Sequence, residues 1–375
     1  MKGHIRKRSG NAYELTYELP RDANGKRRQG HKTVHGSKKE AEASLRAILT
    51  SLDTGNYITP TQETVGVFLG RWLNTYAATR TTVRTQMAYR SIIRAYLSPT
   101  LGSTALAALK PEHIQGVYSA LLARDLSPQT VLHAHRVLHR ALASAVKEGS
   151  ISRNVCDSVD APKAPKREMS TLDVDGIQRL FEAAEDSPCR DAFYVALYTG
   201  VRRSELLALQ WNNIDLVNNR LSVVAGLHFI TGKGLVLLPT KTKRSRRAVT
   251  FTQEVTDVFR AIQGAQLVSK AELGEIWQDT GFVFTKPDGT PMDPARVTRA
   301  FAAVMNKAGI SGVRLHDLRH THASLMLIAG VHAKVVSERM GHANIGITMD
   351  TYSHVLPGLQ EDAADKFAEV VRDAR

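Results

Sequence analysis

The sequence contains very little of what stabilises secreted or membrane-embedded proteins. Among 375 residues there are only two cysteines, Cys156 and Cys189. This excludes a disulfide scaffold and a cysteine-rich metal site, so we expect two reduced thiols. No run of about eighteen apolar residues is present to cross a bilayer. The first residues carry no signal-peptide pattern, which predicts an intracellular protein without membrane contact.

Negative charge is also scarce. Asp and Glu number 36 against 50 Lys and Arg, which gives a net charge of +14 and a pI of about 9.8. Such an excess favours a polyanionic partner, and nucleic acid is the simplest one because no basic helix carries a lipid-type apolar face. With 43% apolar residues, the chain can form two or three domains with proper cores.

Residues 1–57 are predicted to form a small basic sheet followed by a helix. Apolar and polar side chains alternate over residues 13–19, as in a strand with one buried face. Ser37 and Glu40 have the spacing of a capping box that starts a helix. Residues 1–60 hold twelve Lys and Arg against six Asp and Glu, a net of +6. This favours a sheet that binds DNA over a merely solvated hairpin. The candidate contacts on the returning strand are Lys26, Arg27, Arg28 and Lys32.

Residues 62–160 are predicted to be all helical, and Ser127 caps the longest helix. His135 and His139 lie four residues apart on that helix, but no carboxylate or cysteine ligand accompanies them at a matching spacing, so we do not predict a metal site. A stripe that faces phosphates and an ordinary solvated face remain as alternatives. The candidate DNA contacts on this helix are Arg136 and Arg140.

A linker rich in proline and charge is predicted at residues 161–168. The remainder, 169–375, mixes helices with a small antiparallel sheet, whose strands are predicted at 221–224, 234–238 and 247–251. The predicted fold class is therefore multidomain α+β, with a three-stranded sheet plus helix, an all-α bundle and a mainly helical third domain.

Five short motifs in the second half of the chain combine into one chemical set. They read TGVRRSEL at 199–206, PTKT at 239–242, HDLRHTHAS at 316–324, MGH at 340–342 and TY at 351–352. Together they supply a tyrosine hydroxyl, imidazoles, a lysine and guanidiniums. These groups can act as nucleophile, proton carriers and cationic clamps for phosphoryl transfer without a metal.

In this order and spacing the motifs resemble those of the tyrosine recombinases, specifically the integrases of phages and integrative elements. The resemblance extends over roughly half of the chain, and it departs from the family pattern at Arg203 and Met340, where aliphatic residues are usual. It implies an arm-type DNA-binding domain at 1–57, a core-type DNA-binding domain at 62–160 and a catalytic domain at 169–375.

The resemblance implies a role for each residue that carries it. Tyr352 is the nucleophile, which attacks a DNA phosphodiester and forms a 3′-phosphotyrosyl link. Arg202 and Arg319 clamp the scissile phosphate, because guanidinium stays charged and offers planar paired donors. His316 serves in acid–base catalysis, and His342 donates to a non-bridging oxygen.

Four further expectations concern other residues in or beside the motifs. Lys241 is the expected general acid for the leaving 5′ oxygen. Glu205 supports Arg202 or His316, with an ordinary role at the start of a helix as the alternative. His320 and His322 are assigned no catalytic step. The cationic residues expected to contact phosphates beside Lys241 are Lys243, Arg244 and Arg246.

The predicted function is site-specific integration and excision of a phage or mobile element, without cofactor, metal or ATP. The resemblance implies a homotetramer on double-stranded attachment sites, with a host DNA-bending protein and an excisionase as possible partners, in the bacterial cytoplasm at the nucleoid. A monomeric topoisomerase shares the chemistry, but the separate basic module argues against it. A DNA-binding regulator would leave the five motifs without purpose, and a metal-dependent nuclease would require a metal ion.

Overall fold

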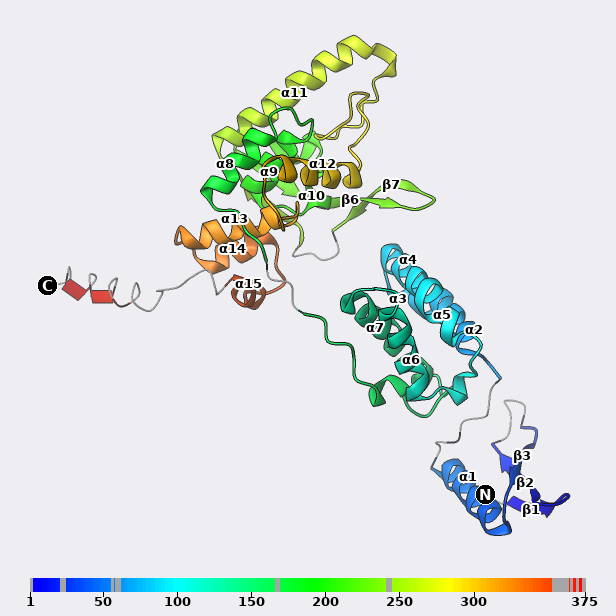
Figure 1. Ribbon diagram of the computed structural model, residues 1–375. Helices are drawn as coiled ribbons and strands as arrows, with labels where there is room; N and C mark the ends of the chain where they lie inside the picture. The colour runs from blue at the N-terminus through cyan, green and yellow to red at the C-terminus, as the bar shows by residue number, and fades with distance from the viewer. Residues whose placement is uncertain are drawn as a thin grey trace. The chain divides into compact units, whose positions relative to one another are not determined.

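The chain folds into two compact units, Met1–Lys166 and Arg167–Arg375 (Figure 1). The computed structural model describes residues 3–20, 25–54, 57, 62–165, 169–240 and 245–352, together with 364, 367, 368, 371 and 372. Within these residues, no helix is both long and apolar enough to span a membrane.

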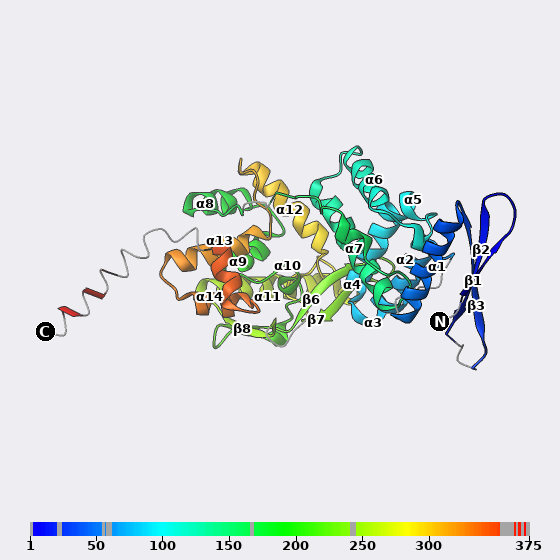
Figure 2. The same cartoon turned by 90° about the horizontal axis from the view of Figure 1, so that it is seen from below.

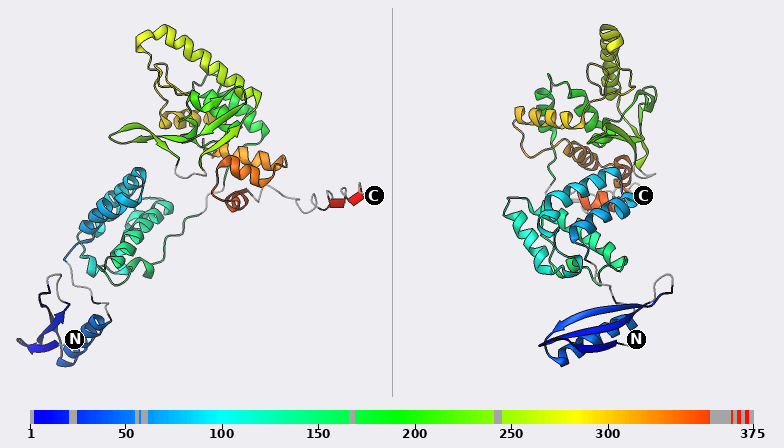
Figure 3. Two further views of the ribbon diagram at one scale, coloured as in Figure 1. Left: turned by 180° about the vertical axis from the view of Figure 1, so that it is seen from behind. Right: turned by 90° about the vertical axis from the view of Figure 1, so that its right-hand side faces the viewer.

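The first unit begins with a three-stranded antiparallel sheet and one helix (Figures 2 and 3). The elements are β1 (Gly3–Lys7), β2 (Ala12–Leu19), β3 (Arg28–His35) and α1 (Lys38–Asp53). The predicted capping box is present, since Ser37 and Glu40 exchange side-chain and backbone hydrogen bonds. Leu15 and Tyr17 of the central strand are buried against α1, so the alternating pattern in the sequence correctly identified the face that packs.

A helical bundle with its own core follows in the same unit. Its elements are α2 (Val65–Trp72), η1 (Leu73–Ala77), α3 (Ala78–Arg80), α4 (Val83–Ile92), η2 (Ile93–Leu97), α5 (Ser98–Leu101), η3 (Leu106–Ala108), α6 (Pro111–Leu122), α7 (Pro128–Lys147) and η4 (Val155–Ser158). Ser127 caps α7 as predicted, accepting a hydrogen bond from the backbone of Thr130. Trp72 is fully buried and donates from its indole nitrogen to Ser144 at 3.0 Å, which satisfies the polar edge of the ring inside the core.

The second unit is mainly helical. Its helices are α8 (Val174–Ala183), α9 (Arg190–Thr199), α10 (Arg203–Leu206), η5 (Trp211–Asn213), α11 (Gln253–Leu273), η7 (Gly274–Ile276), α12 (Pro294–Lys307), α13 (Asp317–Ile328), α14 (Ala333–Met340) and α15 (Ile345–Tyr352). Its strands are β4 (Ile214–Asp215), β5 (Arg220–Val223), β6 (Ala225–Ile230), β7 (Gly234–Pro239) and β8 (Arg247–Thr250).

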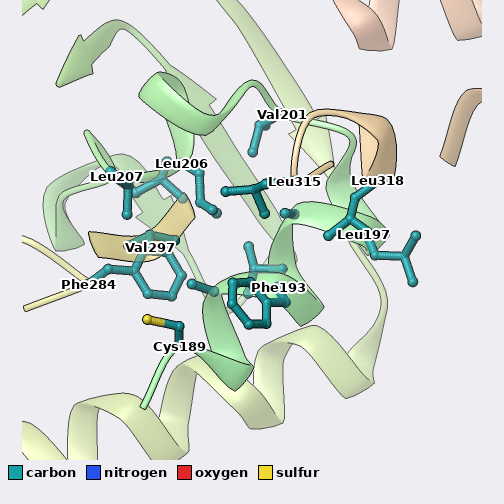
Figure 4. Packing of buried hydrophobic residues seen from close by; sticks show 14 of the residues in the cluster. Cys189, Phe193, Leu197, Val201, Leu206, Leu207, Phe284, Val297, Leu315 and Leu318 are labelled. Carbon is teal, nitrogen blue, oxygen red and sulfur yellow. The ribbon is translucent and has the colours of Figure 1, made fainter. Parts of the chain in front are cut away.

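The sheet of this unit is split in two. β4, β5 and β8 form one antiparallel sheet, and β6 with β7 forms a separate hairpin inserted between β5 and β8. Three of these strands lie where the sequence predicted them, whereas β4 and β6 were missed. Figure 4 shows part of the core, in which Phe193 and Leu197 of α9 belong to the same buried cluster as Leu315 and Leu318 at the start of α13. This packing fixes α13 against α9, and both helices carry the residues of the candidate site.

Candidate active site

Helix ends bring the motif residues of the second unit together. Arg202 precedes α10, His316 precedes α13, and Arg319 lies in the first turn of α13. His342 follows the glycine that ends α14, and Tyr352 is the last residue of α15. Lys241, Lys243 and Arg244 lie outside the described residues.

A buried carboxylate, Glu205, organises the arginines. Its Oε1 accepts from the guanidinium of Arg202 at 2.7 Å, and its Oε2 accepts from Arg247 Nη2 at 2.8 Å. Burial acts to raise the pKa of Glu205, but the hydrogen bond from Arg247 and the charges of Arg247 and Arg202 outweigh it and lower the pKa to about 2. Glu205 is therefore ionised. Of the alternatives that the sequence left open, the structure shows contacts with Arg202 and also a role at the start of α10, where Oε2 accepts from the backbone amide of Arg202 at 2.9 Å.

Arg247 is a second buried guanidinium, which the sequence did not single out. Besides Glu205, it donates from Nε to the carbonyl of Arg339 at 2.6 Å. It thereby ties the first residue of β8 to the last turn of α14, three residues before His342. No signal in the sequence separates it from its cationic neighbours, because its importance comes from contacts across the fold.

Arg319 is held by backbone carbonyls. Its Nη1 donates to Gly200 at 2.6 Å, and its Nη2 donates to Met340. Burial lowers the pKa of this guanidinium, and the charge of Arg202 adds to the effect, but guanidinium remains protonated at neutral pH. The carboxylate of Glu205 opposes this effect only in part. A buried cation that lies near a second guanidinium favours binding of an anion.

Two glycines allow the backbone to approach these arginines. Gly200 and Gly341 end α9 and α14 in the left-handed conformation, with φ of 64° and 63°. A Cβ at Gly200 would lie 2.5 Å from the ring of His322, and one at Gly341 would lie 3.0 Å from Nη1 of Arg247. Both positions therefore need glycine for conformation and for space.

The protein environment lowers the pKa of the two candidate catalytic histidines, His316 and His342, and this favours their uncharged form. Burial and the charges of Arg319 and Arg202 lower the pKa of His342 to about 4, and its Nδ1 lies 2.8 Å from the hydroxyl of Thr348. His316 is exposed. Desolvation by the surrounding protein atoms, with smaller effects from His320 and Arg319, lowers the pKa of its imidazole below the ordinary value.

Tyr352 points into this cluster. Its side chain is 1% exposed, and burial raises its pKa to about 12, while the charge of Arg319 acts in the opposite direction. Its hydroxyl lies 2.7 Å from Nδ1 of His320. No catalytic role was expected for His320 from the sequence, although its distance of four residues from His316 places the two on one side of α13.

His322 takes part in a hydrogen-bond network that supports the site. Burial and the charge of Arg339 lower the pKa of His322 to about 3, and its Nε2 accepts from Nε of Arg339 at 2.9 Å. Arg339 also donates to the carbonyls of Thr250 and Tyr198, at 2.7 and 3.1 Å. This network joins α9, α13, α14 and β8.

The arrangement suits a tetrahedral oxyanion next to a tyrosine. Three guanidiniums, those of Arg202, Arg247 and Arg319, surround the single carboxylate of Glu205, and the side chain of Arg202 is 35% exposed. Among the residues that the structure describes, no group of three or more His, Cys, Asp or Glu side chains converges to hold a metal ion.

The other predicted DNA contacts are distributed over several surfaces. Arg136 and Arg140 are exposed one turn apart on α7, and Arg140 donates to the hydroxyl of Tyr89 at 3.0 Å. Arg246 is exposed just before β8. Lys26 and Arg27 precede β3 and are exposed as well.

The strand register of the N-terminal sheet shows which side chains lie on each of its two faces. Lys32 lies opposite Leu15, so its exposed side chain leaves the sheet on the side that α1 covers, and Arg28 does the same opposite Leu19. The other face carries His31, which lies opposite Thr16 and contacts its hydroxyl at 3.2 Å. The open face therefore carries His31, whereas Arg28 and Lys32 leave the sheet on the face that α1 covers.

The motif region matches a known family. The profile of the phage integrase family matches residues 170–358, and the profile of the phage integrase N-terminal SAM-like domain matches residues 64–122.

Individual proteins agree with these matches. A tyrosine recombinase XerC-like protein of Caldanaerobacter subterraneus is 28% identical over 372 residues, covering 94% of this chain and 95% of its own. The integrase of transposon Tn1549, solved with circular intermediate DNA, has a TM-score of 0.70 at 21% identity and covers 81% of this chain and 99% of its own. A lambda integrase tetramer on a Holliday junction has a TM-score of 0.56 at 20% identity, over 91% and 95% of the two chains. The two structures share the fold described above.

Proposed function

Because this chain belongs to the phage integrase family, and is thus a tyrosine recombinase of the mobile-element type, we propose that it integrates and excises an element through a 3′-phosphotyrosyl intermediate. The phenolic oxygen of Tyr352 attacks the scissile phosphorus, a P–O bond to tyrosine forms, and the bond to the 5′ oxygen breaks. The 5′ hydroxyl of a partner strand later reverses the step. Bond energy is kept in the covalent link, so neither ATP nor a metal ion is consumed.

The observation that carries this proposal is the position of Tyr352 beside buried Arg319, within one cluster that also contains Arg202 and His342. Arg202 and Arg319 neutralise the non-bridging oxygens as charge builds on them. His342 donates to one of these oxygens, and Glu205 holds Arg202 in place.

Proton transfer is assigned to two further motif residues. Lys241 protonates the leaving 5′ oxygen, since a desolvated lysine can titrate near neutral pH. His316 serves as an acid–base group near the phosphate, which the charge of Arg202 acting on its imidazole supports.

The remaining domains hold the DNA. We assign residues 1–57 to an arm-type site and 62–160 to the core site, with a homotetramer as the active assembly in the bacterial cytoplasm at the nucleoid. Support comes from the lambda integrase, whose structure is a tetramer on a Holliday junction. A host DNA-bending protein and an excisionase would set the direction of the reaction.

Covalent trapping tests the proposal. The protein is incubated with DNA that flanks its own gene, in EDTA and without ATP, and is quenched with SDS. We expect a protein–DNA adduct with the wild type and none with Tyr352→Phe, because phenylalanine removes only the attacking oxygen. DNA affinity, measured by gel shift, should stay nearly unchanged.

Three other outcomes point to other functions. Tight binding without an adduct, for wild type and variant alike, would contradict strand transfer and favour a regulator. DNA cleavage that needs a divalent cation, stops in EDTA and leaves no adduct would indicate a metal-dependent nuclease. Relaxation of supercoiled DNA that carries no attachment site would favour a topoisomerase.

A further inference from the structure

A second histidine, to which the proposed reaction gives no role, contacts the candidate nucleophile. Nδ1 of His320 lies 2.7 Å from the hydroxyl of Tyr352, and their ring centroids are 5.8 Å apart. Among the described residues, no other hydrogen-bond partner of this hydroxyl is found. The contact joins α13 to α15, so folding itself brings this imidazole to the hydroxyl.

His316 lies farther from the hydroxyl. Its ring packs edge-on against the ring of His320, with centroids 5.2 Å apart, and within the described part of the chain it makes no hydrogen bond to Tyr352. The two histidines therefore differ in their contacts: His320 lies against the hydroxyl of Tyr352, whereas His316 packs against the ring of His320.

We propose that His320 is the catalytic residue that takes the proton of Tyr352 during strand cleavage. The inference rests on the proposed function, because it needs Tyr352 as the nucleophile. The O–H bond breaks and the proton moves to the lone pair of Nδ1, while the phenolic oxygen forms its bond to phosphorus. The electron pair of the breaking P–O bond goes to the 5′ oxygen, which is protonated by Lys241. On rejoining, the imidazolium returns its proton to the departing phenolate.

The surroundings of His320 keep it in the form that can accept a proton. Burial lowers its pKa, the carboxylate of Asp317 opposes this, and the charges of Arg319 and Arg314 add to it. At neutral pH the ring is then uncharged, and Nδ1 is free to accept when the ring proton is on Nε2. The titratable and charged groups around this ring are Arg314, His316, Asp317, Arg319, His342 and Tyr352.

The test compares His320→Asn with the wild type in single-turnover adduct formation. The asparagine amide can hydrogen-bond the tyrosine hydroxyl from about the position of Nδ1, but it cannot take up the proton. We expect adduct formation at pH 7 to slow on the order of 100-fold, with DNA affinity unchanged. His332→Asn is the matched control, because His332 is an exposed helix cap where asparagine serves equally well. It should react at the wild-type rate.

The dependence on pH distinguishes proton transfer from mere positioning. The wild-type rate should be level near neutral pH and fall as the pH drops through the lowered pKa of His320, since the protonated ring cannot accept. In His320→Asn the phenol must ionise on its own, so the rate should rise about tenfold per pH unit above neutrality. Added imidazole should restore part of the rate of His320→Gly.

Several results would overturn the inference. One is a rate for His320→Asn within about twofold of the wild type, and another is an unchanged pH profile. Faster adduct formation by His320→Asn would show that His320 restrains Tyr352 instead of activating it. If the wild type forms no adduct that depends on Tyr352, the proposed function itself is contradicted. That result is distinguishable, because it appears before any histidine is changed.

Discussion

At the scale of single residues, Glu205 offers the clearest test of how the site is held together. Glu205→Gln leaves the guanidiniums of Arg202 and Arg247 without their buried counter-charge, so we expect the free energy of unfolding to fall by about 3 kcal/mol. Urea denaturation of the two proteins measures this difference. Glu185 is exposed, so the same substitution there, Glu185→Gln, should change the free energy of unfolding by no more than about 0.5 kcal/mol.

The pH dependence of this effect has a defined sign. The pKa of Glu205 in the folded protein is about 2, below the unfolded value of about 4.3. Its contribution is therefore complete above about pH 4.3 and is lost as the pH falls towards 2. Wild type and Glu205→Gln should converge in stability across this acidic window. A difference that persists at its lower end would contradict the assignment.

The sequence predicted which residues gather at the site better than it predicted their contacts. Arg202, Arg319, His342 and Tyr352 were nominated from motif spacing, and all four lie in one cluster. The contact between His320 and Tyr352 was not predicted, because it depends on how α15 packs against α13.

At the scale of elements, the helix ends determine where the arginines are held. Gly200→Ala would force a side chain into the left-handed region with its Cβ 2.5 Å from the ring of His322. We expect the free energy of unfolding, measured by thermal or urea denaturation, to fall by about 3 kcal/mol. Adduct formation should also be lost, because the carbonyl of Gly200 holds Arg319.

Gly330→Ala is the control for backbone strain alone. Its φ of 76° is similar, but a Cβ at that position would meet no heavy atom within 4 Å beyond its chain neighbours. Gly330→Ala should lower the free energy of unfolding by about 1 kcal/mol and leave adduct formation intact. Equal losses for the two variants would show that strain, and not crowding by His322, explains the requirement for glycine.

Elements with strong local signals were predicted and those without were missed. The capping box at Ser37 and the cap at Ser127 marked the starts of α1 and α7. β6 escaped because it follows β5 after a single residue and its burial does not alternate, so nothing in the local pattern marks where one strand ends and the next begins.

At the scale of the whole molecule, the basic N-terminal module should be dispensable for chemistry and required for integration. Deletion of residues 1–57 removes a sheet and helix with their own small core, while the motif residues all lie in the second unit. We expect adduct formation on core-site DNA to persist and integration into a target site to fall sharply. An in vitro integration assay with separated attachment sites measures this.

Two further measurements make the deletion experiment more specific. Binding of the full chain should depend more steeply on salt than binding of the truncated chain, because fewer phosphate contacts remain after the deletion. Integration at the full rate after deletion would defeat the assignment of an arm site. Substitution of His31, on the open face of the sheet, would then show whether that face contributes to binding at all.

The two cysteines have a practical consequence. Cys156 lies in the core of the helical bundle and Cys189 in the core of the second unit, at 1% and 2% exposure. Burial raises the pKa of Cys156 to about 12 and also raises that of Cys189, so neither thiol is reactive while its core is intact. Each unit thus contains its own built-in chemical reporter: an alkylating reagent registers the opening of one core independently of the other, without any label being introduced.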